Sequence, residues 1–211
     1  MNSKHRQAPG HSGCESESQL FIKDRLNAMK IIIVGGGGRE HALAWKIAQS
    51  PQCEKLYCTP GNPGIETVAE SVSVPSGEGF APLIEWCKSN GIDLVVVGPE
   101  RPLSEGIVDA LQAAGIKAFG PTAAAAQLEA SKRFAKELMG EAGIPTAAAG
   151  TFTDLDAALT YLDAQSLPIV IKAEGLAEGK GVTVAHTREE AIEALRLCLS
   201  EQVFGEAGRE V

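Results

Sequence analysis

The stretch KIIIVGGGGREHALAWKI, residues 30–47, decides the fold of this chain. It opens with an uninterrupted apolar run of the kind found in a strand that is buried on both faces. Four glycines end the run, and the apolar residues at 42, 43, 45, 47 and 48 then have helical spacing. We therefore expect a strand, a tight glycine turn and a helix, which together form the first unit of an α/β fold.

The same alternation continues along the chain. Further strands are predicted at residues 55–58, 92–97 and 117–119, with helical patterns between them. Such alternation indicates a parallel sheet with helices on both faces, and ligands gather at the carboxyl edge of such sheets. Thr122 is a good helix cap, and we expect one helix from residue 123 to about residue 139.

The pattern changes after residue 150. Apolar strands at 168–173 and 181–185 are joined by a glycine-rich loop, which predicts an antiparallel hairpin in a separate α+β unit. Thr187 and Glu190 have the spacing of a capping box for a last helix. We expect a disordered extension at 1–28, a first domain at 29–130 and a second domain at 131–211. The second domain is small for an independent core, so we expect it to be incomplete.

Composition excludes several classes of protein. The chain has 211 residues, 44% of them hydrophobic and 22% charged, as in ordinary soluble domains. A net charge of −8 argues against nucleic-acid binding, and no apolar run is long enough to cross a membrane. Five irregularly spaced cysteines indicate free thiols in the reducing cytoplasm and argue against a metal site.

The first glycine-rich loop favours an anionic ligand. In a dinucleotide fingerprint, GxGxxG, Gly35 and Gly37 fit but Glu40 takes the third glycine position, so the prediction of NAD binding is weak. A helix N-terminus and the planar donors of Arg39 still suit phosphate. The alternative is that the glycines only permit a tight turn. His41 lies close to this loop, without a nameable partner for base catalysis.

Two further loops are turns by composition. They are Gly61-Asn62-Pro63-Gly64 and Gly98-Pro99-Glu100, and each alone is better explained as structural. Because both follow predicted strands, they should share one rim with the first loop. Together they would line a pocket for a small polar substrate, with Glu100 available to an amine or a hydroxyl.

The segment IVIKAEGLAEGKGV, residues 169–182, favours a nucleoside triphosphate. Lys172 ends an apolar strand, where a phosphate is a natural partner for its charge. Gly175, Gly179 and Gly181 with Lys180 do not form a Walker A loop but resemble a flexible flap over phosphates. The alternative is a mobile hairpin with a solvated lysine.

Five strings together carry a resemblance to a known family. They are GGGGREHALAWKIAQSP (35–51), PGNPG (60–64), DLVVVGPERPL (93–103), FGPTAAAAQLEASKRFAKELM (119–139) and residues 169–182. From residue 29 onward the chain resembles the glycinamide ribonucleotide synthetase (phosphoribosylamine–glycine ligase) family. The resemblance implies a Rossmann-like, parallel-sheet pre-ATP-grasp domain followed by a partial α+β ATP-grasp domain.

The resemblance also implies an activity. Members of this family join glycine to 5-phosphoribosylamine in de novo purine synthesis, through an acyl phosphate made from ATP. ATP and Mg²⁺ or Mn²⁺ are the implied cofactors, and the full-length enzyme is expected to be a cytoplasmic monomer. No catalytic side chain or metal ligand is matched, and the metal ligands are expected beyond Val211, so the chain alone should lack complete activity.

The resemblance assigns site residues by position. The implied ATP-binding residues are Lys132, Lys172, Glu174, Gly175, Gly179, Lys180 and Gly181. The implied substrate-binding residues are Gly37, Gly38, Arg39, Glu40, His41, Gly61, Asn62, Gly64, Gly98, Pro99 and Glu100.

Departures from the family pattern leave alternatives open. Glu174 stands where the family commonly has Asp, and Glu178 stands where a smaller residue is common. One alternative is a non-catalytic truncated module that binds phosphoribosyl compounds or partner chains. Another is a different ATP-grasp ligase or carboxylase.

Overall fold

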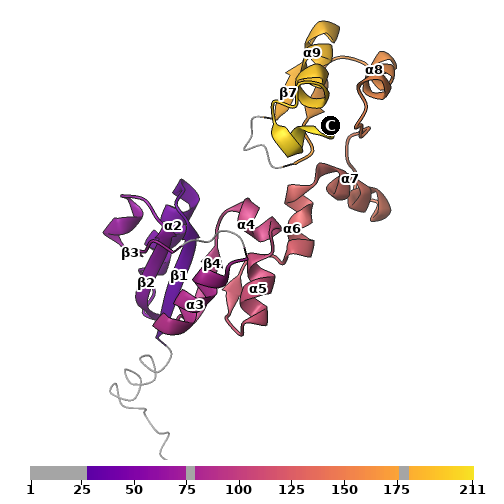
Figure 1. The fold of residues 1–211 in the computed structure, drawn as a ribbon. Coiled ribbons are helices and arrows are strands. Elements are labelled where there is room, and N and C mark those ends of the chain that lie inside the picture. Colours follow the sequence, from indigo (N-terminus) through magenta and orange to yellow (C-terminus); the bar gives the residue numbers. More distant parts are fainter. Residues whose placement is uncertain (1–27, 75–78, 176–180) are drawn as a thin grey trace, which may run out of the picture.

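The computed structural model describes residues 28–74, 79–175 and 181–211 (Figure 1). The first part of the chain alternates strands and helices, as predicted. Its strands are β1 (Met29–Gly35), β2 (Cys53–Pro60), β3 (Glu70–Ser71), β4 (Leu94–Val97) and β5 (Ala118–Phe119). Its helices are α2 (Gly38–Ile47), η1 (Ile65–Thr67), α3 (Ala81–Asn90), α4 (Glu100–Ser104), α5 (Ile107–Ala113) and α6 (Ala123–Ala130).

These strands form one parallel sheet in the order β3-β2-β1-β4-β5. The chain first builds outward from β1 to β3, and then returns to place β4 on the other side of β1. The strand order therefore reverses between β1 and β4. In open parallel sheets this switch point is where a crevice opens for ligands.

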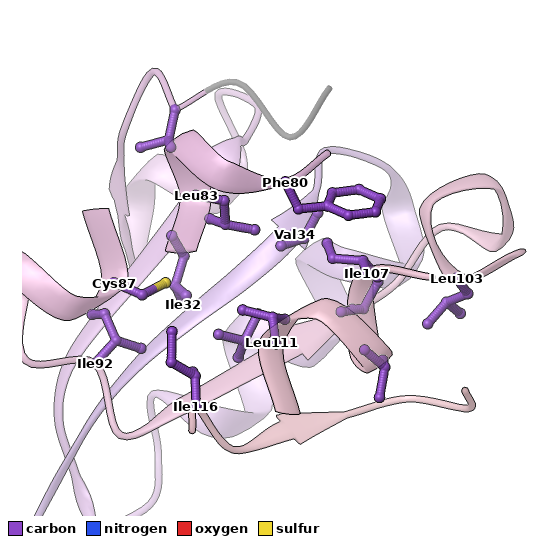
Figure 2. Close-up of a cluster of buried hydrophobic side chains, with 14 of the residues drawn as sticks. Ile32, Val34, Phe80, Leu83, Cys87, Ile92, Leu103, Ile107, Leu111 and Ile116 are labelled. Atoms are coloured by element: carbon purple, nitrogen blue, oxygen red, sulfur yellow. The ribbon is translucent and has the colours of Figure 1, made fainter. Parts of the chain in front are cut away.

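Two apolar clusters cover the two faces of the sheet. Ile32 and Val34 of β1 pack with Leu83 of α3 and Leu111 of α5, as Figure 2 shows. The neighbouring residues of β1 point to the opposite face, where they pack against α2. Both faces need apolar side chains, which explains the uninterrupted run in the sequence. Ile32 is fully buried, and burial of such a side chain stabilises the fold by about 1.5–3 kcal/mol.

The prediction of one helix from residue 123 to about residue 139 is wrong. The structure has α6 and then a second helix, α7 (Lys132–Glu141). Ser131 lies between them in an extended conformation, with φ −125° and ψ 114°. Its hydroxyl accepts the N–H of Phe134 at 3.0 Å and so caps the new helix. The predicted cap of α6 by Thr122 is confirmed.

The last part of the chain is an α+β unit around an antiparallel hairpin, as predicted. Its elements are α8 (Leu155–Asp163), β6 (Ile169–Lys172), β7 (Val182–Ala185), α9 (Arg188–Leu199) and η2 (Gly205–Gly208). Figure 1 shows this unit apart from the parallel sheet, with α6 and α7 between them. The capping box of Thr187 and Glu190 at the start of α9 is confirmed.

The hairpin is covered on one face only. Ile171 and Ala185 pack with α8 and α9 in a small apolar cluster. On the other face, Val170, Val182 and Val184 are 47%, 45% and 52% exposed. Strand alternation places Lys172 on that open face as well, as the sequence predicts.

Candidate functional site

Three loops meet at the carboxyl edge of the parallel sheet. They are residues 35–38 after β1, 61–64 after β2 and 98–99 after β4. Because the three strands are adjacent and parallel, their carboxyl ends lie at one edge. The structure therefore brings together the loops that the sequence assigns to one rim.

Asn62 ties the first two loops together. Its Nδ2 donates a hydrogen bond to the Gly36 carbonyl at 2.7 Å. Its Oδ1 accepts the N–H groups of Gly64 and Ile65, at 2.8 and 2.9 Å, and so begins η1. Both the amide nitrogen and the amide oxygen of Asn62 are thus used in hydrogen bonds to the backbone of these loops, and these bonds fix how the two loops face the rim.

Close backbone approach explains the glycines of these loops. A Cβ atom on Gly36 would lie 2.5 Å from the Gly61 carbonyl oxygen, a distance that no real side chain tolerates. Gly61 itself has φ +75°, in the left-handed region that favours glycine. The two loops touch through bare backbone, which keeps the rim narrow.

Charged side chains link the first and third loops. Arg39 donates from Nε to Glu40 and from a terminal guanidinium nitrogen to Glu100, both at 2.9 Å. The side chains of Arg39 and Glu100 are about half exposed, at 52% and 46%, whereas that of Glu40 is 4% exposed. An exposed ion pair thus spans the rim above a buried carboxylate.

These contacts shift the titration of the exposed pair. The hydrogen bond from Arg39 lowers the pKa of the Glu100 carboxyl below its ordinary value. The hydrogen bonds to Glu100 and then to Glu40 raise the pKa of the Arg39 guanidinium. Both groups are therefore charged at neutral pH. Two of the five N–H donors of the guanidinium serve these bonds, and such planar donors suit phosphate.

The remaining predicted rim residues lie at the starts of α2 and α4 or beside the second loop. Gly37 caps α2 and Gly38 is its first residue, while Pro99 caps α4 directly after Gly98. The imidazole of His41 packs against Gly64, the last residue of the second loop, because a Cβ on Gly64 would lie 2.5 Å from the His41 Cε1. His41 therefore contributes to the wall between α2 and the second loop.

A cavity of about 770 Å³ adjoins the same edge of the sheet. Its lining includes Thr59 and Pro60 from the end of β2, Phe80 before α3, and Pro99, Arg101 and Glu105 around α4. Of these, sequence reasoning identified only Pro99. Arg101 and Glu105 were not predicted, although Arg101 directly follows the predicted loop Gly98-Pro99-Glu100.

A second group of predicted residues lies where β6 meets α7. The Nζ of Lys132 donates to the carbonyl oxygens of Glu174 and Gly175, at 3.0 and 3.1 Å. The carboxylate of Glu174 accepts the N–H of Arg133 at 2.9 and 3.0 Å and the hydroxyl of Ser131 at 2.5 Å. This carboxylate therefore ties the start of α7 to the end of β6.

Sequence reasoning missed the partners of Glu174. Ser131 was hidden inside an expected continuous helix, although serine is a preferred N-cap residue. Gly181 is buried, and its carbonyl accepts the N–H of Ala173 at 2.8 Å across the hairpin. Gly179 and Lys180 lie outside the described residues.

Lys172 points to the open face of the hairpin. Within the described ranges its ammonium has no acidic partner, while the three exposed valines surround its strand position. An apolar platform beside a lysine offers room for a flat ring and a charge for phosphate.

Among the described residues, no group of three or more His, Cys, Asp or Glu side chains is placed to hold a metal ion. Nor is any helix of this part of the chain long and apolar enough to cross a membrane.

Comparison with known proteins identifies the family. Residues 29–129 match "Phosphoribosylglycinamide synthetase, N domain", and residues 130–211 match "Phosphoribosylglycinamide synthetase, ATP-grasp (A) domain". The chain belongs to this family. The resemblance found in the sequence is thereby confirmed, and so is the α/β fold with an ATP-grasp relationship.

Individual relatives agree with this assignment. The chain is 54% identical over 183 residues to phosphoribosylamine–glycine ligase of Rhizobium meliloti, and 53% identical over 184 residues to that of Nostoc sp.. Each match covers 87% of this chain and 43% of the relative. The chain therefore spans less than half the length of the curated relatives that it matches.

Solved structures show the same fold. The Thermotoga maritima phosphoribosylamine–glycine ligase superposes with a TM-score of 0.67 at 32% identity, over 83% of this chain and 41% of that chain. The biotin carboxylase domain of Hydrogenobacter thermophilus 2-oxoglutarate carboxylase gives 0.64 at 16% identity, over 85% and 43%. The second likeness concerns the fold alone.

Proposed function

We propose that the full-length protein joins glycine to 5-phosphoribosylamine, converts ATP to ADP and phosphate, and so makes glycinamide ribonucleotide for de novo purine synthesis. The observation that carries this proposal is the identity of 54% to a phosphoribosylamine–glycine ligase across 87% of the chain. A carboxylase function has less support, because the carboxylase structures that share the fold are only 14–19% identical to this chain.

The rim of the parallel sheet is the proposed substrate site. Arg39 supports this role, since its half-exposed guanidinium keeps donors for a phosphate. Glu100 is the charged group on the rim that would attract an amine. The proposed substrate-binding residues are Gly37, Gly38, Arg39, Glu40, His41, Gly61, Asn62, Gly64, Gly98, Pro99 and Glu100.

The open face of the hairpin is the proposed wall of the ATP site. Lys172 would contact the triphosphate from that face. Lys132 would hold the start of the glycine-rich loop through its hydrogen bonds to the carbonyl oxygens of Glu174 and Gly175. The proposed ATP-binding residues are Lys132, Lys172, Glu174, Gly175, Gly179, Lys180 and Gly181.

The proposed reaction has two steps. A carboxylate oxygen of glycine attacks the γ-phosphorus of ATP, the bond to ADP breaks, and an acyl phosphate forms. The amine of phosphoribosylamine then attacks the acyl carbon, phosphate leaves and the nitrogen loses a proton. Lysines and backbone N–H groups would stabilise the transferring phosphoryl group by charge and position, with no covalent role for a side chain.

Mg²⁺ or Mn²⁺ is the expected metal of this reaction. The described residues hold no group of three or more acidic, histidine or cysteine side chains placed to bind a metal ion. We therefore assign no step to a metal here and propose that its ligands come from residues outside the described ranges.

The proposal extends to organisation and location. We propose a first domain at 29–130, a second at 131–211, and a monomeric full-length enzyme without nucleic-acid or membrane partners. The extension expected at 1–28 lies outside the described residues, apart from residue 28. A cytoplasmic location is supported by the described cysteines, Cys53, Cys58, Cys87 and Cys198, which are all free thiols.

The test is phosphate release from ATP in the presence of glycine and freshly made phosphoribosylamine. The 211-residue chain and the product of the whole open reading frame that contains it are measured in parallel. We expect turnover that depends on both substrates from the whole product. Its absence would refute the ligase proposal, and binding of phosphoribosyl compounds without turnover would favour a non-catalytic module.

A paired substitution sharpens the assay. Lys172→Met in the whole product is expected to raise the KM for ATP and lower kcat, because a phosphate contact is lost. Lys88→Met, at the exposed end of α3, is the matched control and should change neither. Equal kinetics for the two variants would contradict the role proposed for Lys172.

A further inference from the structure

Glu40 lies at the switch point of the parallel sheet. Its side chain runs from α2 into the space between the ends of β1 and β4, and the residue is only 3% exposed. A Cβ on Gly35 would lie 2.6 Å from its Cγ, and a Cβ on Gly98 would lie 2.1 Å from its Oε1. The chain therefore needs glycine at the ends of both strands to accommodate this one carboxylate.

The buried carboxylate is fully engaged within the protein. Its Oε2 accepts the N–H of Gly37 at 2.7 Å, and its Oε1 accepts Nε of Arg39 at 2.9 Å. The first bond satisfies the Gly37 N–H at the start of α2, where the helix dipole favours a negative charge. The second fixes the guanidinium, whose other end reaches Glu100 after β4.

This arrangement explains why the dinucleotide fingerprint is broken. In GxGxxG loops, glycines let the backbone approach a pyrophosphate at the switch-point crevice. Here the third position of that pattern is Glu40, and its carboxylate fills the crevice from inside. A pyrophosphate would meet a buried negative charge and an N–H group that is already bonded.

We propose that Glu40 is a specificity-determining and positioning residue, whose carboxylate occupies the switch-point crevice, excludes dinucleotide pyrophosphates and holds Arg39 across the rim against Glu100. The ligand surface is thereby displaced from the crevice to the Arg39–Glu100 bridge above it. The role of Glu40 in positioning Arg39 rests on the proposed function, because it concerns the substrate rim. Its role in excluding pyrophosphate does not rest on that function.

The experiment uses the 211-residue chain, labelled with ¹⁵N, and inorganic pyrophosphate as the probe. Glu40→Gly restores the fingerprint glycine and empties the crevice, while Glu40→Gln keeps the volume and removes the charge. Glu85→Gln, on the exposed side of α3, is the control. Chemical shifts of the amides of residues 36–39 report binding, and hydrogen exchange of the Arg39 Nε–H reports its hydrogen bond.

We expect pyrophosphate to perturb those amides in Glu40→Gly with an affinity at least about tenfold above that of the unsubstituted chain. Glu40→Gln should stay closed to pyrophosphate and yet exchange its Arg39 Nε–H at least about tenfold faster. The control should match the unsubstituted chain in both readouts.

Two results would overturn the proposal. Equal pyrophosphate affinity in the unsubstituted chain and Glu40→Gly would show that the carboxylate excludes nothing. Unchanged exchange of Arg39 Nε–H in Glu40→Gln would show that it does not position Arg39. If Glu40→Gly loses its cooperative unfolding transition, the test of exclusion passes to Glu40→Gln. Pyrophosphate binding by Glu40→Gln would then show that the volume of the side chain does not exclude the ligand. None of these readouts depends on ligase turnover.

Discussion

The two sheets of this protein share the same sequence features but place the charged side chain differently, buried in one and exposed in the other. Each has an apolar strand, then glycines, with a charged side chain close to the glycine-rich loop. In the parallel sheet the charge is Glu40, which is buried and bonded within the protein. In the hairpin the charge is Lys172, which stays on an exposed face. The difference lies in coverage, because helices cover both faces of the first sheet and one face of the second.

This difference teaches how each region is suited to a ligand. A strand end enclosed by packed helices can fix side chains to one another, as in the bridge from Arg39 to Glu100. A hairpin with one open face keeps its charge and its three valines accessible. At the rim, the side chains are already held in place before a ligand binds. On the hairpin, the side chains remain accessible on an open apolar face.

The largest expected effect comes from matched valine truncations. Val95→Ala removes two methyl groups from a fully buried position in β4, and should lower the free energy of unfolding by about 2 kcal/mol. Val184→Ala, in β7 at 52% exposure, should change it by less than about 0.5 kcal/mol. Urea titration measures both. Equal losses would break the comparison, because they would show that the open face is covered in solution.

The next effect concerns the link between α7 and β6. Glu174→Gln should cost about 1–2 kcal/mol, because a charged acceptor of the Arg133 N–H and the Ser131 hydroxyl is lost. Ser131→Ala removes the same contact from the other side, so the double variant should cost less than the sum. Additive losses in this double-mutant cycle would show that the two groups do not interact. Glu141→Gln, at the exposed end of the same helix, serves as the control.

A smaller effect is expected for the rim pair as pH changes. The folded pKa of Glu100 is below its ordinary value, so its contribution is present above that value and is lost as pH falls through the lowered one. Both side chains are about half exposed, and solvent screens the pair to less than about 1 kcal/mol. Glu100→Gln should therefore lower stability near neutral pH, and this difference should vanish in acid.

The measurement is urea unfolding of both proteins at about pH 7 and about pH 3. Glu85→Gln is again the control, since that exposed side chain has no hydrogen bond or ion pair to another described residue. A difference that grows in acid would have the wrong sign and would contradict the pairing of Glu100 with Arg39.

The smallest effect on folding is expected for Lys172→Met. The side chain is exposed and pairs with no acid within the described ranges, so the free energy of unfolding should change by less than about 0.5 kcal/mol. Unfolding measured in urea, alongside ATP kinetics of the whole product, separates the two roles. A large loss of stability would mean that Lys172 is a structural residue like Glu40.

Much of the architecture was predictable because it depends on local patterns. The apolar run at 31–34 signals a strand covered on both faces, and the capping box of α9 and the hairpin follow from spacing. The common rim of the three loops follows from parallel strands. The break at Ser131 was not predicted, because the residues on both sides of it favour a helix. The Ser131 hydroxyl caps α7 and donates to Glu174, and the second contact joins segments far apart in the chain.

The sequence by itself determined the α/β fold, the family and the order of the loops at the carboxyl edge, since each of these rests on periodicity or on strings of neighbouring residues. Only the tertiary structure decided that Glu40 fills the crevice between β1 and β4, that Glu174 joins α7 to β6, and that Arg101 faces a cavity. These features depend on contacts between segments far apart in the chain. The physical reason is that such contacts form only once the strands and helices have packed, and a local sequence pattern does not record them.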